Sequence, residues 1–262
     1  MKLRNSGYIM VAAALAIALV SCGKKEETTE TPAATMAPSG QPVDAATAGS
    51  ITGTIKLEGT PPAPGKISMA AEAYCAKEHP TPVPAEDVVV GPGGTLANAV
   101  VYISDDMSKY AVTVPSAPAV IDQKGCMYHP HVVAMVAGQQ LQITNSDATT
   151  HNIHPLPKDN QEWNVSQPPG SAPMMKVWGR PEEAIAVKCN VHPWMKSYMF
   201  AFKNNFFAVT GADGKFTIGN VPPGTYTITV WQEKYGNKTA SVTVPAKGAA
   251  TADVSFSAAS GD

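Results

Sequence analysis

Apolar residues occupy every second position in several short runs of this chain, and this spacing limits what the chain can fold into. One run carries Ile185, Val187 and Cys189, separated by Ala186 and Lys188. A period of two places such residues on one face of a β-strand. Helical spacing is nearly absent after the N-terminus, and Gly and Pro turn signals separate the runs. The pattern predicts an all-β protein.

Metal-ligand side chains follow at the end of that run, in the spacing C-x-x-H-x-x-M. They are Cys189, His192 and Met195, and a strand is predicted directly after them, over residues 196–202. A second histidine, His151, lies a few residues beyond the strand predicted over 140–145. Two His and one Cys with a weak axial Met form the blue-copper electron-transfer site, so this set favours copper.

The pair His151-Asn152 and the C-x-x-H-x-x-M segment resemble the two halves of the copper motif of the cupredoxin family. The short spacing is most similar to amicyanin and pseudoazurin, and the resemblance covers residues 111–203. It implies a Greek-key β-sandwich that holds one type 1 copper ion. It also implies that Asn152 steadies the loop that carries the Cys ligand. The implied copper ligands are His151, Cys189, His192 and Met195.

The segments on either side of this region have strand patterns of their own. G-x-F-x-I at 214–218 and V-P-P-G-x-Y at 221–226, with early strands at 53–57 and 99–103, resemble the carboxypeptidase regulatory-like, transthyretin-like β-sandwich. The resemblance implies that this sandwich is discontinuous. Its parts are then residues 50–108 and 205–258, and the cupredoxin-like domain, residues 109–204, is inserted in it or fused to it. The alternative is two sandwiches in sequence, with the first segment as an extension.

The N-terminus has the pattern of an export signal. Lys2 and Arg4 precede an apolar run over 8–20 that is shorter than the ~20 residues a membrane-spanning helix needs. Residues 1–21 are therefore predicted to be a signal peptide. Leu19-Val20-Ser21-Cys22 resembles the lipobox of bacterial lipoproteins, which implies cleavage before Cys22 and lipidation of its thiol. The alternative is a plain secretory signal with a chance cysteine.

Residues 22–49 are predicted to be a disordered tether, because Thr, Ala, Pro, Glu and Lys dominate and little apolar surface could be buried. With a lipid on Cys22, the folded part would be anchored in the cell envelope, facing the periplasm or the cell exterior. The choice between inner and outer membrane stays open, although Gly23 after the lipidated cysteine favours the outer membrane in a Gram-negative host.

Cys75 and Cys126 have two possible roles. An exported protein meets an oxidising compartment, and a disulfide between them is then the default. The competing interpretation is a second metal site. That site would use Cys75, His79, Cys126, His129 and His131.

The leading functional hypothesis is a membrane-tethered electron carrier that is not an enzyme. A multicopper oxidase needs several further H-x-H pairs, which the remaining histidines do not supply. The expected partners are redox proteins and the membrane, and a net charge of −2 gives no sign of nucleic-acid binding. The alternatives are a copper carrier or storage lipoprotein and a binding module with structural copper.

The turn after Cys189 is predicted to carry the docking surface for a redox partner. His192 is expected to show its ring edge to solvent, with Pro193 and Trp194 as a small apolar patch beside it. The alternative is that Trp194 packs inward and supports the loop, since Trp is highly buried on average.

Overall fold

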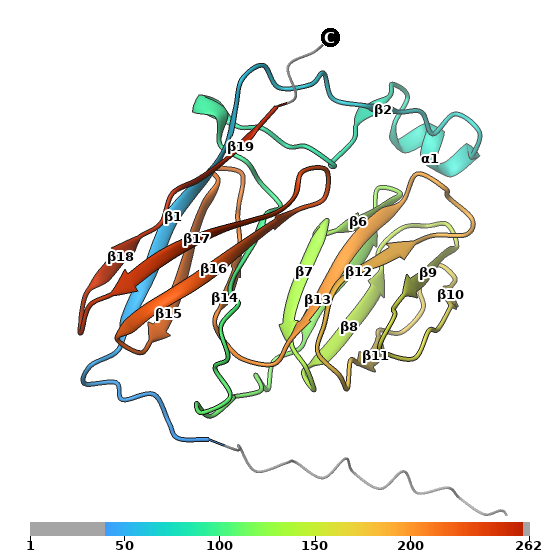
Figure 1. Cartoon of the computed structure of the whole chain (residues 1–262). Coiled ribbons are helices and arrows are strands. Elements are labelled where there is room, and N and C mark those ends of the chain that lie inside the picture. The colour runs from blue at the N-terminus through green and yellow to red at the C-terminus, as the bar shows by residue number, and fades with distance from the viewer. Residues whose placement is uncertain (1–39, 259–262) are drawn as a thin grey trace, which may run out of the picture. The chain divides into compact units, whose positions relative to one another are not determined.

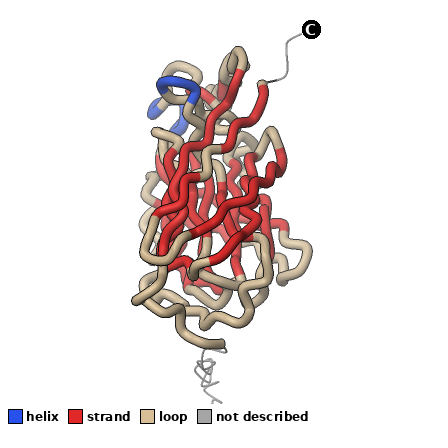
Figure 2. Tube along the Cα trace, turned by 60° about the vertical axis from the view of Figure 1, so that its left-hand side comes forward, coloured by secondary structure: helices blue, strands red, loops and turns tan. Residues whose placement is uncertain are grey.

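The computed structural model describes residues 40–258, which belong to one compact unit. Strands dominate it, and its helices are α1 (Ala73–Glu78) and a 3-10 turn at Pro92–Gly94, so the all-β prediction is confirmed (Figure 2). In the described range, no helix has the length and apolar character that crossing a membrane requires. The predicted signal peptide and Cys22 lie outside the described residues.

The first group of strands comes from both ends of the described chain. One sheet has the order β15-β1-β18, with β19 also paired to β1, and the other has the order β14-β4-β16-β17 (Figure 1). The strands are β1 (Gly49–Glu58), β4 (Val100–Ile103), β14 (Phe207–Val209), β15 (Lys215–Val221), β16 (Gly224–Gln232), β17 (Gly236–Val244), β18 (Ala249–Thr251) and β19 (Val254–Ser257).

The alternation read from the sequence sets the inner faces of these sheets. Ile51 and Ile55 on β1 are fully buried, and Ile218 on β15 packs in the same core. Gly53 pairs with Phe216, and a Cβ at Gly53 would lie 2.2 Å from the carbonyl oxygen of Ala252. Glycine is therefore required where this neighbouring backbone approaches β1.

The second group of strands comes from the middle of the chain and pairs only within itself among the named strands. Its sheets have the orders β10-β9-β12-β13-β7 and β11-β8-β5-β6 (Figure 1). The strands are β5 (Ala119–Lys124), β6 (Met127–His129), β7 (Val132–Val136), β8 (Gln140–Asn145), β9 (His151–Leu156), β10 (Val165–Gln167), β11 (Met174–Val177), β12 (Glu182–Lys188) and β13 (Lys196–Phe202). Along the chain these strands lie between β4 and β14 of the first group.

The two groups of strands are in direct apolar contact. Val100 and Tyr102 of β4 form one buried cluster with Val132 of β7 and with Phe200 and Phe202 of β13. Strand β13 therefore contributes to two cores, because Met199 and Ala201, at the alternate positions, face the core around Cys189.

The prediction of a disordered tether over residues 22–49 is wrong at the C-terminal end of that range. The N–H of Gln41 donates to the carbonyl oxygen of Lys109, and the N–H of Ala111 donates to that of Gln41. Val43 packs against the core of the first group, and β1 already begins at Gly49. One apolar side chain and backbone pairing thus order residues 41–48, and the rest of the predicted tether, residues 22–39, lies outside the described residues.

A short excursion leaves the first group of strands between β1 and β4. It contains β2 (Lys66–Ile67), α1 and β3 (Val83–Pro84), and β2 pairs with β3. Helix α1 begins where the Glu72 carboxylate accepts the N–H groups of Tyr74 and Cys75, which is a side-chain N-cap.

Candidate metal centre

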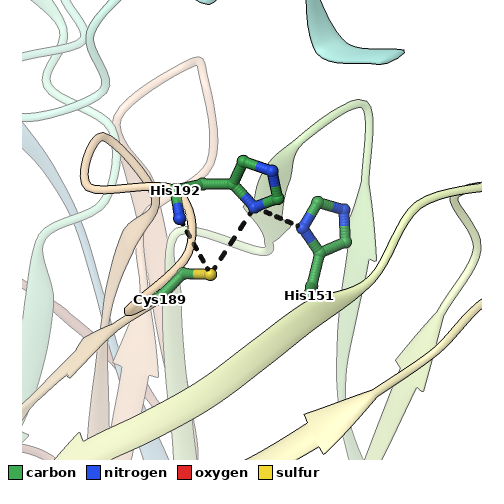
Figure 3. A group of neighbouring side chains, drawn as sticks. All are labelled: His151, Cys189 and His192. Carbon is green, nitrogen blue, oxygen red and sulfur yellow. Dashed lines mark hydrogen bonds between the residues drawn. The ribbon is translucent and has the colours of Figure 1, made fainter. Parts of the chain in front are cut away.

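The first and second groups of strands are called the first and second sandwich from here on. Three of the four predicted ligands converge at one end of the second sandwich. His151 is the first residue of β9, Cys189 follows the last residue of β12, and His192 lies on the loop before β13. Nδ1 of His151 lies 2.9 Å from Nδ1 of His192, which lies 3.6 Å from Sγ of Cys189 (Figure 3). All three side chains are buried, so the cluster is a water-poor group of two imidazoles and one thiol.

The cysteine sulfur is held by its own loop and by Asn152. The thiol donates to Oδ1 of Asn152 at 3.2 Å, and the N–H of His192 donates to the sulfur at 3.3 Å. The same Oδ1 accepts the N–H groups of Asn190, at 2.7 Å, and Val191. Asn152 thus joins β9 to the ligand loop, which is the contact that the cupredoxin resemblance implied.

Asp147 orients His151 from the opposite side of the ring. Its Oδ2 accepts from Nε2 of His151 at 2.8 Å, and its two oxygens also accept the N–H groups of Gly125 and Cys126. A carboxylate only accepts, so Nε2 carries a proton, and in the neutral form of the ring Nδ1 then holds the lone pair that a metal would take. Such carboxylate–histidine pairs fix metal-ligand tautomers.

The pKa shifts follow from these contacts. Burial would raise the pKa of Cys189, but hydrogen bonds from His151 and the backbone lower it. Burial opposes the charged form of His151, yet Asp147 and Cys189 raise its pKa. Burial lowers the pKa of His192, and the nearby His151 lowers it further. The shifts favour the thiolate of Cys189 and the neutral ring of His192, which are the forms that bind a metal, whereas His151 would release a proton when a metal binds.

Met195 lies beside this cluster in the same core. Its side chain is 1% exposed and packs in the cluster that contains Cys189. Its carbonyl oxygen accepts the N–H of Cys189, and its own N–H donates to the carbonyl oxygen of His192. These two bonds close the ligand loop on itself, and the role of Met195 as axial ligand stays a prediction.

The prediction that His192 shows its ring edge to solvent is wrong. The side chain is fully buried, and its Nε2 has no hydrogen-bond partner. Trp194 is half-buried, with its ring centroid 5.2 Å from that of His192 and its Nε1–H donating to the carbonyl oxygen of Cys126. Trp194 therefore packs inward, as the alternative held, and only Pro193 of the predicted docking pair is exposed.

Cys75 and Cys126 form a disulfide with a Cα–Cα distance of 5.8 Å. The alternative second metal site is therefore not formed by these residues. His79 contacts the carbonyl oxygen of Gly125 instead, and His131 contacts Glu233. In the described range, the cysteine left free is Cys189.

Sequence reasoning missed three residues that support the centre. The first is Asp147, four residues before His151. Its nearness to a predicted ligand was visible in the sequence, but nothing there distinguished it from an ordinary turn residue. Burial raises the pKa of Tyr128, whose hydroxyl donates to the carbonyl oxygens of Asn152 and Lys188. The third is Glu72, whose carboxylate lies within 4.8 Å of a ring nitrogen of His192.

Comparisons with known proteins match two parts of the chain. Residues 203–257 match the family model of the carboxypeptidase regulatory-like domain, close to the predicted segment 205–258. No curated protein matches the chain.

Several solved structures have partial similarity to this chain, among them the following three. The copper-containing nitrite reductase NirK from Thermus scotoductus SA-01 is 16% identical, with a TM-score of 0.31; the match covers 37% of this chain and 25% of that one. A purple cupredoxin from Nitrosopumilus maritimus is 19% identical over 32% of this chain and 99% of its own, with a TM-score of 0.28. Amicyanin from Paracoccus versutus is 14% identical over 39% of this chain and 97% of its own, also with a TM-score of 0.28.

Proposed function

We propose that this chain is a type 1 copper protein that transfers electrons outside the cytoplasm. The observation that carries the proposal is the convergence of two imidazole Nδ1 atoms and one thiol sulfur inside a buried β-sandwich. Two His and one Cys, with Met195 as a weak axial ligand, are the ligand types that blue copper takes. When bound, copper supplies one-electron chemistry by alternating between Cu(II) and Cu(I).

The residues of the chain would hold the ligands in place during that exchange. Asn152 fixes the position of the Cys189 sulfur, and Asp147 fixes the ring of His151. Hydrogen bonding around the sulfur and the character of the axial ligand are the features that tune the potential of such sites. Because the cluster is buried, water is excluded from it.

The test is the visible spectrum of the oxidised, copper-loaded protein. We expect an intense thiolate-to-copper band that disappears in Cys189→Ser, while circular dichroism shows that the β-sandwich is retained. A matched control is Met199→Leu, because Met199 is equally buried in the same core and lies outside the ligand set. A Cys189→Ser protein that keeps the band would refute the proposal.

We further propose that the chain is attached to a membrane through a lipid on Cys22, where it meets redox partner proteins. The disulfide supports an oxidising, extracytoplasmic compartment. The signal-like residues 1–21 and the lipobox-like segment support the anchor. Replacing Cys22 with Ser is expected to move the protein from the membrane fraction to the soluble extracytoplasmic fraction. Unchanged fractionation would contradict the anchor and leave the copper proposal untouched.

A further inference from the structure

The segment 66–84, here called the cover, connects the two halves of the molecule at the metal centre. It follows β1 of the first sandwich along the chain and is joined to the second by the disulfide from Cys75 on α1 to Cys126, just before β6. Met69, Cys75 and Cys126 form a buried cluster of their own, and Trp194 of the ligand loop packs against it. In Figure 1, α1 stands next to the loop that joins β12 to β13.

The cover lies beside His192, and the cysteine to which it is bonded, Cys126, lies beside His151. A ring nitrogen of His192, a carboxylate oxygen of Glu72 and the sulfur of Cys75 lie within 4.8 Å of one another. The sulfur of Cys126, a carboxylate oxygen of Asp147 and a ring nitrogen of His151 form a second such group. One sulfur of the disulfide therefore lies beside each imidazole, and His192 is the one that the sequence predicted to face solvent.

Further contacts fasten the cover to the second sandwich. Nε2 of His79, at the end of α1, lies 2.8 Å from the carbonyl oxygen of Gly125. The hydroxyl of Tyr74 donates to Asp147 at 3.5 Å, and the side chain of Trp194 packs against the cluster that contains Met69 and Cys75. The cover is thus held at its helix, at its disulfide and by the ligand loop beneath it.

We infer that the cover, locked by the Cys75–Cys126 disulfide, closes the His192 side of the cluster and sets the access of small molecules to it. A loop histidine with no covering segment would show its ring edge to solvent, whereas His192 is 0% and Cys189 3% exposed. The part of this role that concerns bound copper rests on the proposed function. The closure over Cys189 does not, because it is a property of the chain alone.

Alkylation of Cys189 by iodoacetamide in the metal-free protein tests the closure, with the modification quantified on the peptide that contains Cys189. We expect slow alkylation of the native protein. The double variant Cys75→Ser/Cys126→Ser should react about tenfold faster or more, because removal of the lock raises the population of locally open states. Tyr226→Phe is the matched control, since it removes a hydrogen bond to Pro222 in the first sandwich, away from the cover.

An equal rate in the native protein and in a folded double variant would overturn the inference, as would an equal acceleration in Tyr226→Phe. If circular dichroism shows that the double variant is unfolded, His79→Ala decides, because it releases the end of α1 and leaves the disulfide intact. Faster alkylation of Cys189 in His79→Ala supports the cover, and an unchanged rate refutes it. Because no metal is added, failure here is distinguishable from failure of the copper proposal.

Discussion

At the scale of single residues, the two imidazoles are held differently. His151 has a full hydrogen-bond partner in Asp147, whereas Nε2 of His192 is buried without one. Hydrogen bonds from His151, Cys126 and Gly125 outweigh burial and lower the pKa of Asp147, so it stays a carboxylate at neutral pH. A fixed negative charge beside one ring favours a proton on Nε2 and leaves Nδ1 for the metal.

The contribution of Asp147 is testable by charge removal. Asp147→Asn keeps the size of the side chain and loses its charge, so we expect copper affinity to fall about 10- to 100-fold, the range for partners of metal ligands. The measurement is competition for copper with a chelator of known affinity. Asp122→Asn is the control, because Asp122 accepts from Thr144 and Ser146 and not from a predicted ligand. Equal losses of copper affinity in both variants would show that the effect comes from the net charge of the protein and not from the contact between Asp147 and His151.

At the scale of elements, the loop 189–195 buries the side chains of its predicted ligands and half-buries Trp194, whereas Val191 is exposed. Trp194→Lys removes packing against His192 and the hydrogen bond to Cys126, and we expect it to lower the free energy of unfolding by about 2 kcal/mol or more. Val191→Lys, on the same loop and 54% exposed, should change it by less than about 0.5 kcal/mol. Denaturant titration of both variants measures the difference. If Trp194→Lys is as stable as the native protein, Trp194 does not pack into the interior.

The elements also show what the sequence could predict. Strands β8 and β12 lie where period-two alternation placed them, because alternation depends only on neighbours along the chain, and β13 follows the ligand loop as predicted. The spacing of Cys189 and His192 could be recognised for the same reason, because both residues lie on one short segment of the chain. The burial of His192 could not be predicted, because its neighbours Glu72 and Cys75 lie far away in the sequence and the residues of a loop do not show which distant segment packs on it. The ordered residues 41–48 escaped prediction for the same reason, since their pairing partners lie near Lys109 and Ala111.

At the scale of the whole molecule, a charged network joins the two groups of strands beside the apolar contact. Glu233, which follows β16, accepts from Nζ of Lys196 at 2.6 Å, and its other oxygen lies 2.6 Å from Nε2 of His131. Burial would raise the pKa of Glu233, but the contacts with His131 and Lys196 lower it below its usual value. Lys196 leads directly from the ligand loop into β13, so the second metal-binding segment is tied to the first sandwich.

Glu233→Gln tests this connection through its pH dependence. A carboxylate whose folded-state pKa is lowered contributes stability above its unfolded-state pKa, near 4.3, and loses it as the pH falls through the folded-state value. We therefore expect Glu233→Gln to lower the free energy of unfolding by about 1–3 kcal/mol at neutral pH, the range for hydrogen bonds to charged groups. The difference from the native protein should shrink progressively below about pH 4. Urea titrations at pH 7 and in the acid range measure it, with the exposed Glu58→Gln as the control. A difference that stays constant from neutral to acid pH would show that Glu233 acts through packing, and its charge would then play no part in holding the two groups of strands together.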